Sequence, residues 1–596
     1  MTPSLNREKT EPLTRVELVT QEPAVNWLSP VQLLKTGLRV LMADMVGGMS
    51  DPRLVHAALT PEAAATPTWR AESKDDGDAA PFWLDYLADT GDGWDSTYSV
   101  AWSVAREQLD VPGAGALPRA QVLVLGGDQV YPTPADQAYR TRFLDPFRSA
   151  LPSAIPTAED PSAPKMVAIP GNHDWYDGLS GFMRLFASGG SIGRWQTVQK
   201  RSYFALQLPH GWWLWGLDLQ LASEMDAPQY AYFKAMAAQL RPGDRVVLCP
   251  PEPSWADPNV QLGENQTALE NVEHLQPRFT SLRQIEALIA QRRDEDVRLA
   301  AVIAGDSHHY ARYAPWATES ADAPQRITCG GGGAYLLGTH GLLERLRFRG
   351  GAGLETHQRV ATFPSVDESR ALRDRAWRLP VANPVFGLTL AGVYAVGILL
   401  ALSASSAVCR SPWAWIWALS LVLGAGLFTR NGAPKTGGSW GPLVGGMVHG
   451  ALHVGLAAAV GWLGRAWPGC GLVAAGAVTG WIGGGLLFGL WLMLSNRWLG
   501  WHDEESFSAQ AITDHRSFLR MRIDAEGLTI YPLGIRKACT RWQLGRGIEL
   551  LRQAKRTWRL RAHTGSGPRF EPVDPIQVEL IEAPIRLRRS SPARSI

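Results

Sequence analysis

Two short loops that each follow an apolar run place the strongest constraint on the fold of this chain. Gly-Gly-Asp-Gln-Val-Tyr at 126–131 follows the apolar run 122–125, and Gly-Asn-His-Asp at 171–174 follows the run 166–170. Short apolar runs bounded by turn residues are typical of buried strands. A strand that ends in a carboxylate, or in an amide followed by an imidazole, brings oxygen and nitrogen ligands to the edge of a sheet. Two such strand ends are what a two-metal hydrolytic site requires.

Two further apolar runs end in the same way. The run 82–88 leads into Asp89, and the run 298–304 leads into Gly-Asp-Ser-His-His at 305–309. A single aspartate after a strand is usually a helix cap or a turn residue, and a lone histidine is more often a satisfied polar group than a ligand. Four strand ends that all close on Asp, Asn or His make coincidence the poorer explanation. The sequence therefore predicts one site at the ends of four strands.

These motifs resemble those of the calcineurin-like metallophosphoesterases, and their spacing is most similar to that of the purple acid phosphatases. The family motifs are GDxG, GDxxY, GNH[DE], a strand-end His and GHxH. Residues 127–131 match the second motif, 171–174 match the third, and 305–312 align with the last. Asp89 stands in the first motif without its leading glycine. The resemblance covers roughly residues 80–340 and implies an α/β fold of four layers, an αββα sandwich.

Two departures from the family pattern change the ligands that the resemblance implies. Asp306 replaces the first His of GHxH, and Glu252 is the only plausible ligand where the strand-end His is expected, since His210 and His274 follow no clear strand. The first metal site is implied to contain Asp89, Asp128, His308 and Tyr131. The second is implied to share Asp128 as a bridge and to add Asn172, Asp306 and Glu252.

The ligand types set the expected cofactors. A carboxylate oxygen is a harder ligand than an imidazole nitrogen. Its presence in the second site therefore favours manganese or magnesium over zinc there. The motif GDxxY implies that Tyr131 is a phenolate ligand to ferric iron, and its alternative is a core tyrosine. We expect two divalent or mixed-valence metal ions, with manganese or iron favoured and magnesium or zinc as alternatives.

Four residues are expected to act on the substrate. The resemblance implies that His173 stabilises or protonates the leaving oxygen. Asp174 either orients that imidazole or caps a turn. Arg201 and Arg312 can bind a phosphate oxygen through the planar guanidinium group, or they are surface charges.

The C-terminal half has a different composition. From Pro384 to about Ser495, charge nearly vanishes, and four apolar stretches each approach the roughly 20 residues that a bilayer requires. We place these spans at 384–408, 412–429, 442–464 and 471–495. Basic residues gather before the first span, in the loop 430–441 and after the last span, so the positive-inside rule places both ends of the chain in the cytoplasm.

The flanking regions complete the predicted organisation. Residues 31–46 have an amphipathic helical pattern, 518–535 read as a β-hairpin, and 575–582 add a strand. We divide the chain into an N-terminal helical extension, a metallophosphoesterase domain, a basic juxtamembrane linker, a four-helix transmembrane domain, and a C-terminal cytoplasmic β module with a basic tail: 1–80, 81–345, 346–383, 384–496 and 497–596.

The expected function is that of a phosphoesterase in the cytoplasmic membrane. The net charge of +2 and the lack of a nucleic-acid-binding motif exclude a broad polyanion-binding surface, so no nucleic acid partner is expected. Membrane attachment favours a lipid-linked phosphate or phosphodiester, although tethering also serves enzymes of soluble nucleotides. The alternative is a membrane sensor or scaffold whose phosphoesterase fold binds metal or ligand without turnover.

Overall fold

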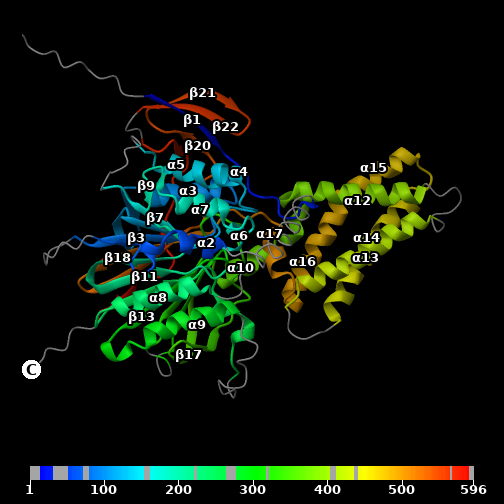
Figure 1. Cartoon of the computed structure of the whole chain (residues 1–596). Helices are drawn as coiled ribbons and strands as arrows, with labels where there is room; N and C mark the ends of the chain where they lie inside the picture. The colour runs from blue at the N-terminus through cyan, green and yellow to red at the C-terminus, as the bar shows by residue number, and fades with distance from the viewer. Residues whose placement is uncertain are drawn as a thin grey trace, which may run out of the picture.

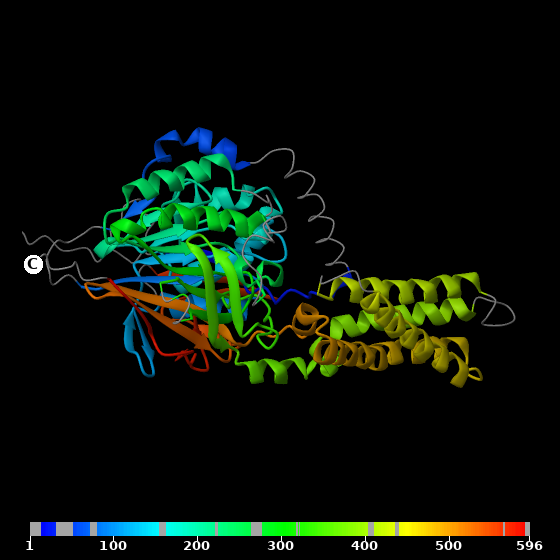
Figure 2. The same ribbon diagram turned by 90° about the horizontal axis from the view of Figure 1, so that it is seen from below.

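The computed structural model shows a mixed α/β part with several sheets, joined to a separate group of long helices (Figure 1). It describes residues 14–30, 52–71, 80–153, 162–220, 225–263, 277–316, 320, 322–402, 411–434, 440–563 and 567–589. The helix predicted at 31–46 and the alternative ligand His274 lie outside these residues. Figure 2 shows that the long helices extend from one side of the α/β part.

One large sheet is formed by strands from both ends of the chain. Its strand order is β24-β19-β18-β3-β6-β7-β9-β8, with β25 paired to β19. The strands are β3 (Phe82–Leu87), β6 (Val122–Leu125), β7 (Lys165–Ala168), β8 (Gly190–Ile192), β9 (Trp195–Thr197), β18 (Arg516–Asp524), β19 (Gly527–Ile535), β24 (Glu579–Leu580) and β25 (Ile585–Arg588). Because β3, β6 and β7 are parallel neighbours, the loops that follow them lie at one edge of the sheet.

The second large sheet contains the fourth predicted strand. Its order is β16-β17-β14-β15-β13-β12-β11-β10-β2. The strands are β2 (Trp69–Arg70), β10 (Phe204–Gln207), β11 (Trp212–Gly216), β12 (Arg245–Cys249), β13 (Arg298–Ala304), β14 (Tyr310–Pro315), β15 (Gln325–Cys329), β16 (Arg345–Gly350) and β17 (Gly353–Phe363). The apolar runs predicted as strands before the four motifs are thereby confirmed as β3, β6, β7 and β13.

The two large sheets share one apolar core. Leu84 and Val124 of the first sheet belong to the same buried cluster as Phe204 and Ile303 of the second. A second cluster joins the first sheet to α3 (Trp94–Ala105), α5 (Asp145–Ala150) and α7 (Ser180–Phe186), and a third joins the second sheet to α8 (Ala227–Gln239) and α9 (Pro277–Ala290). Strand faces that are buried on both sides explain the continuous apolar runs in the sequence.

Smaller elements surround this core. A three-stranded sheet joins β1 (Thr14–Thr20) to β22 (Thr557–His563) and β21 (Ile548–Ala554), so a strand from the N-terminal part of the chain pairs with one from the C-terminal part. Two hairpin-sized sheets pair β4 (Gln108–Val111) with β5 (Gly115–Pro118) and β20 (Trp542–Leu544) with β23 (Phe570–Pro572). Short helices include α2 (Pro52–Leu59), α4 (Asp136–Ala138), α6 (Asn172–Trp175), α10 (Val366–Arg373), α11 (Leu379–Ala382) and α17 (Asp503–Ser508).

The predicted hairpin at 518–535 forms, but it is not part of a separate β module. Strand β18 pairs with β3 from Leu519 to Ile523 and so extends the first large sheet. Arg520 and Asp85 make two bonds of 2.8 Å across this pair, and both side chains are buried. Because β18 supplies the partner that a buried Asp85 requires, the C-terminal segment is an integral part of the α/β fold.

Four helices are long and apolar enough to cross a membrane. They are α12 (Pro384–Leu402), α13 (Pro412–Asn431), α14 (Gly441–Leu463) and the long helix Gly469–Leu499, in which a π-helical turn joins α15 (Gly469–Thr479) to α16 (Gly485–Leu499). The predicted spans are therefore confirmed as helices over their described residues. Inside the bundle, the Tyr394 hydroxyl lies 2.8 Å from His453 Nδ1, and His453 Nε2 lies 3.0 Å from His449 Nε2.

Candidate metal centre

The four strand-end motifs meet at one place in the structure. Asp89, Asp128 and Asn172 follow the neighbouring strands β3, β6 and β7, while Asp306 and His308 follow β13 of the other sheet. The Asp306 amide donates a 2.8 Å hydrogen bond to Asp89 Oδ2, which ties the two sheets together at the site. The tertiary fold thus brings together side chains that are more than 200 residues apart in the sequence.

Four of these residues have a left-handed backbone. The φ angles are 60° at Asp89, 50° at Asp128, 68° at Asp306 and 46° at His308. Non-glycine residues rarely adopt this region, and such strain is concentrated at functional sites. The backbone is therefore turned away from regular geometry at the positions where candidate ligands leave their strands.

Three candidate ligands converge on one oxygen atom. The Tyr131 hydroxyl lies 3.2 Å from Asp89 Oδ1, 3.0 Å from Asp128 Oδ2 and 2.9 Å from His308 Nε2. Within the described ranges, no group of three His, Cys, Asp or Glu side chains is arranged to hold an ion as it stands. The phenol oxygen occupies the position on which the three ligand atoms of the predicted first site converge.

The electrostatics of this cluster are unfavourable without a cation. Burial raises the pKa of Asp89 well above its usual value, and Asp128 and Asp306 raise it further. Burial also raises the pKa of Asp128 and of Asp306. In the part of the chain that the structure describes, none of the three carboxylates forms an ion pair with Lys or Arg. His173 lowers the pKa of Asp128 and Arg278 lowers that of Asp306, in each case against the larger effect of burial. A cluster of carboxylates with no Lys or Arg ion pair fits a metal ion, which would stabilise their ionised forms.

His308 is suited to bind a metal rather than to carry a charge. Burial lowers the pKa of its imidazole well below the usual value, with a smaller contribution from His173. A neutral imidazole keeps a lone pair for a metal, whereas an imidazolium has none. The donor set of two carboxylates, a phenol and an imidazole is thus compatible with one transition-metal ion.

The predicted ligands of the second site are less closely assembled. Asn172 begins α6, and its Oδ1 accepts a 2.9 Å hydrogen bond from the His173 amide. Glu252 forms an ion pair with Arg278 and accepts a 3.3 Å hydrogen bond from Gln220. Glu252 lies close enough to Asp306 to raise the pKa of that residue, but its carboxylate already has a basic partner. His210 lies in the turn Pro209–Gly211 before β11 and is not part of this cluster.

His173 is positioned by the protein backbone and not by Asp174. Its Nδ1 lies 2.8 Å from the Pro132 carbonyl, and its amide donates a 2.9 Å hydrogen bond to Asp128 Oδ1. Asp174 instead accepts hydrogen bonds from the amides of Gly171 and Gln129 and, at 2.6 Å, from the Tyr139 hydroxyl. Of the two roles predicted for Asp174, the turn cap is therefore the one with contacts in the structure.

The two predicted substrate contacts are engaged elsewhere. Arg312 binds Glu582 through Nε at 2.8 Å and also through a terminal nitrogen. Arg201 is 5 % exposed and donates hydrogen bonds to Thr60 and to the Tyr203 hydroxyl. Both guanidinium groups join segments of the α/β part, which differs from the prediction that they bind a phosphate oxygen.

Sequence reasoning missed the aromatic residues beside the cluster. The Trp27 ring lies 5.9 Å from that of Tyr131 and 6.0 Å from that of His173, and the Tyr335 ring lies 4.6 Å from that of His308. Asp92 holds both aromatic segments, because it accepts hydrogen bonds from the Trp27 indole and the Tyr335 amide. The one available signal was that Tyr335 directly follows a run of four glycines and an alanine.

Glycine is required where the backbone passes close to the candidate ligands. A Cβ at Gly171 would lie 2.1 Å from Asp128 Oδ1, and one at Gly330 would lie 2.3 Å from Asp89 Oδ2. Any side chain at either position would displace a candidate ligand.

Comparisons with known proteins give little beyond a partial likeness. No family model and no curated protein matches the sequence. Among solved structures, purple acid phosphatase PPD1 from yellow lupin (Lupinus luteus) seeds is similar at 12% identity over 48% of this chain and 49% of that chain, with a TM-score of 0.30. A structure of PhoD is similar at 12% identity over 44% of this chain and 59% of that chain, with a TM-score of 0.26. The chain thus spans about half the length of the lupin protein, and likeness this low identifies neither site residues nor a substrate.

Proposed function

We propose that this chain is a membrane-tethered phosphoesterase that hydrolyses a phosphate monoester or diester with two bound metal ions. The observation that carries the proposal is the convergence of Asp89, Asp128 and His308 on the phenol oxygen of Tyr131. The αββα arrangement is supported by the core that the two sheets share and by the helices packed on their outer faces. A lipid-linked ester is one substrate class that membrane attachment favours.

The proposed ligands divide between two ions. Asp89, Asp128, Tyr131 and His308 would hold the first ion, and Asp128, Asn172, Asp306 and Glu252 the second. Glu252 would have to exchange Arg278 for the metal. When bound, the pair would activate a water molecule and neutralise phosphoryl oxygens. We propose manganese or iron, with magnesium or zinc as alternatives.

His173 is the proposed proton donor to the leaving oxygen. The half-buried imidazole lies beside Asp128, to which its backbone amide is bonded. Because the Pro132 carbonyl can only accept a hydrogen bond, Nδ1 is the donor in this contact, which leaves Nε2 available to the substrate. Asp174 would act through the loop it holds and not through the imidazole.

The proposed location is the cytoplasmic membrane, with the phosphoesterase part in the cytoplasm. Strand β3 precedes the four long helices and strand β18 follows them, yet the two strands pair. This pairing supports a topology in which the chain returns to the side from which it entered the membrane. The basic residues around the helix ends support the cytoplasmic side.

A sensor or scaffold without turnover is the second candidate. Two observations favour it: Asp306 replaces a histidine of the family motif, and Glu252, the only candidate ligand where the strand-end histidine is expected, is paired with Arg278. A protein of this kind would bind metal or ligand and leave esters intact.

The deciding experiment measures hydrolysis by the purified full-length protein. The substrates are 4-nitrophenyl phosphate and bis(4-nitrophenyl) phosphate, each with manganese, iron, zinc or magnesium. We expect metal-dependent turnover that disappears in Asp128→Ala and His173→Ala. Asp110→Ala and His563→Ala, which change exposed residues of β4 and β22, serve as matched controls. Absence of turnover by a folded, metal-loaded protein would reject the proposal in favour of the sensor.

A further inference from the structure

Exposed tryptophans mark the two ends of the helical bundle. Near the α/β part, Trp440 precedes α14 and Trp498 lies at the end of α16, with exposed fractions of 73% and 71%. At the other end, Trp413 begins α13 and Trp462 ends α14, with exposed fractions of 62% and 65%. Tryptophan is enriched where a bilayer meets water. Trp440 and Trp498 therefore mark the headgroup layer on the side of the α/β part.

Two consecutive residues connect the candidate site to the bundle. Trp27 lies against Tyr131 and His173, while the next residue, Leu28, packs with Phe386 of α12 and Leu492 of α16. Consecutive Cα atoms are about 3.8 Å apart. Phe386 is the third residue of α12, and Leu492 lies six residues, or about 9 Å along the helix, before Trp498. The Trp27 segment therefore adjoins the ends of both helices on the side of the α/β part.

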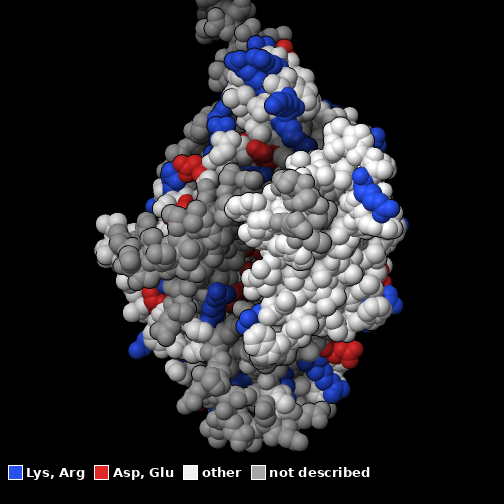
Figure 3. All heavy atoms as spheres, turned by 90° about the vertical axis from the view of Figure 1, so that its right-hand side faces the viewer, with Lys and Arg blue, Asp and Glu red and all other residues white. Residues whose placement is uncertain are grey.

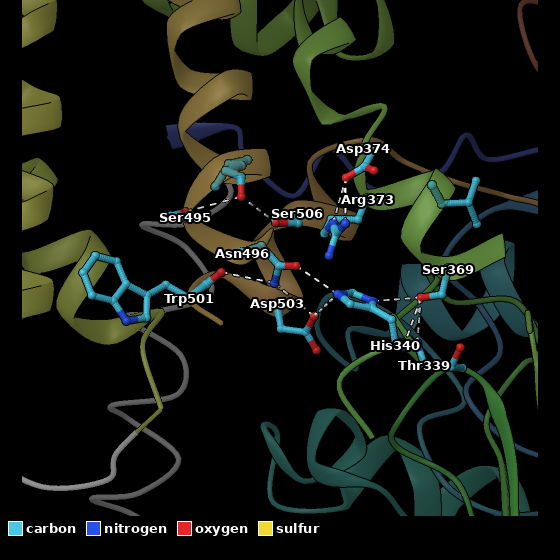
Figure 4. Close-up of polar contacts among 12 residues, drawn as sticks. Thr339, His340, Ser369, Arg373, Asp374, Ser495, Asn496, Trp501, Asp503 and Ser506 are labelled. Carbon is cyan, nitrogen blue, oxygen red and sulfur yellow. Dashed lines mark hydrogen bonds and ion pairs between the residues drawn. The ribbon is translucent and has the colours of Figure 1, made fainter. Parts of the chain in front are cut away.

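A second segment makes the same connection independently. Tyr335 contacts His308, and its neighbour Leu336 packs with Phe507 of α17, the short helix that follows the last span. Five residues after Tyr335, His340 Nε2 lies 2.9 Å from Asn496 Oδ1 near the end of α16 (Figure 4). The site is thus joined to the helix ends on two sides.

The surface around this junction suits a lipid headgroup. Figure 3, seen from the side of the helices, shows a hollow beside their apolar surface with Asp or Glu atoms inside it. Arg375, Arg378 and Arg497 are exposed at the same ends of the helices. Exposed arginines at this level attract anionic lipid headgroups.

We propose that the substrate is an amphiphilic phosphate ester that remains in the adjoining leaflet while its phosphate enters the site. The inference rests on the proposed phosphoesterase function and names its substrate class. Water supplies the oxygen that bonds to phosphorus, the P–O bond to the leaving alcohol or phenol breaks, and that leaving group takes up a proton. The product that carries the long chain stays in the bilayer and the other product leaves to water.

The test compares esters that differ only in chain length, with the full-length protein reconstituted in phosphatidylcholine vesicles. Hexadecyl phosphate in the vesicles is compared with butyl phosphate in solution, and 4-nitrophenyl hexadecyl phosphate with 4-nitrophenyl butyl phosphate. The expected kcat/KM for the membrane-held ester is higher by at least about tenfold, because the leaflet concentrates the ester at the site. Equal or lower values for the long-chain esters would overturn the inference, while turnover of the short-chain esters would keep the proposed function.

A variant pair tests the structural basis of the preference. Leu28→Ala removes the side chain that anchors the Trp27 segment in the bundle. Leu109→Ala is the matched control, since Leu109 has the same exposed fraction of 6% and packs in the α/β core. We expect Leu28→Ala to lose most of the preference for long chains and to keep its rate on butyl phosphate. An undiminished preference would contradict the role of Leu28, and the wild-type comparison stands even if a variant fails to fold.

Discussion

Asp85 lies within β3 and Asp89 lies just after its end, four residues further along the chain. Both side chains are buried, but their surroundings differ. Asp85 has Arg520 as a bidentate partner, which opposes the effect of burial on its pKa. Asp89 has two other carboxylates near it, which add to that effect. A buried charge that is bonded to its counter-charge needs no further partner. The ionised forms of several buried carboxylates, in contrast, are stabilised when a cation binds between them. We therefore propose the cluster around Asp89, and not the Asp85–Arg520 pair, as the functional site.

The largest expected effect comes from removing a charge at the cluster. Asp128→Asn should lower turnover by at least about 10³-fold, the factor that corresponds to several kcal/mol of lost charge stabilisation. The same change should leave the metal-free protein equally or more stable, since it removes like-charge repulsion. Steady-state kinetics and thermal unfolding with a chelator measure the two effects. An Asp128→Asn protein that is active but unstable would show that Asp128 has a structural role, like that of Asp85, and not a functional one.

His173→Ala tests whether the imidazole beside the cluster donates a proton to the leaving oxygen. We expect kcat for alkyl phosphates to fall by about 10²–10⁴-fold, the usual contribution of a general acid. The loss should be much smaller for 4-nitrophenyl phosphate, whose leaving oxygen needs no proton. Equal losses for both substrates would argue against the proton-donor role.

A change in the Asp85–Arg520 pair should lower stability and leave metal binding intact. Asp85→Asn leaves Arg520 buried with a neutral partner, and it should lower the free energy of unfolding by about 3–5 kcal/mol. Metal content per folded protein should stay unchanged. Asp110→Asn on the exposed face of β4 is the control. A stable Asp85→Asn protein that has lost its metal would place Asp85 in the functional cluster.

The smallest expected effect is a difference in pH dependence. Since the pKa of Asp89 is raised in the folded state, the folded protein binds more protons than the unfolded chain above pH 3.8. The stability of the metal-free protein should therefore fall as pH rises from about 4 toward the raised pKa, by at most about 1.4 kcal/mol per pH unit for each such group. Manganese should reverse the trend, because it binds the ionised carboxylates. Thermal unfolding with chelator or metal, in wild type and Asp89→Asn, measures this slope, and an unchanged slope in the variant would contradict the assignment.

The sequence predicted the local part of the site well. The runs before Asp89, Asp128, Asn172 and Asp306 form strands as expected, because a continuous apolar run between turn residues is a local signal. The sequence could not show which of the candidate side chains already have a partner in the folded protein. Arg312 and Glu252 have the right chemistry for a phosphate and for a metal, but Glu582 and Arg278 bind them from distant segments.

The sequence by itself determined the strands, the four long apolar helices and the types of candidate ligand at the strand ends. Only the tertiary structure decided which polar groups meet. It paired β18 with β3 across the four intervening helices, and it placed Trp27 and Tyr335 between the candidate ligands and the ends of α12 and α16. The physical reason is that an apolar pattern depends only on residues that are neighbours in the sequence. The partner of a buried charge or of an aromatic ring, in contrast, comes from whichever segment the fold places beside it.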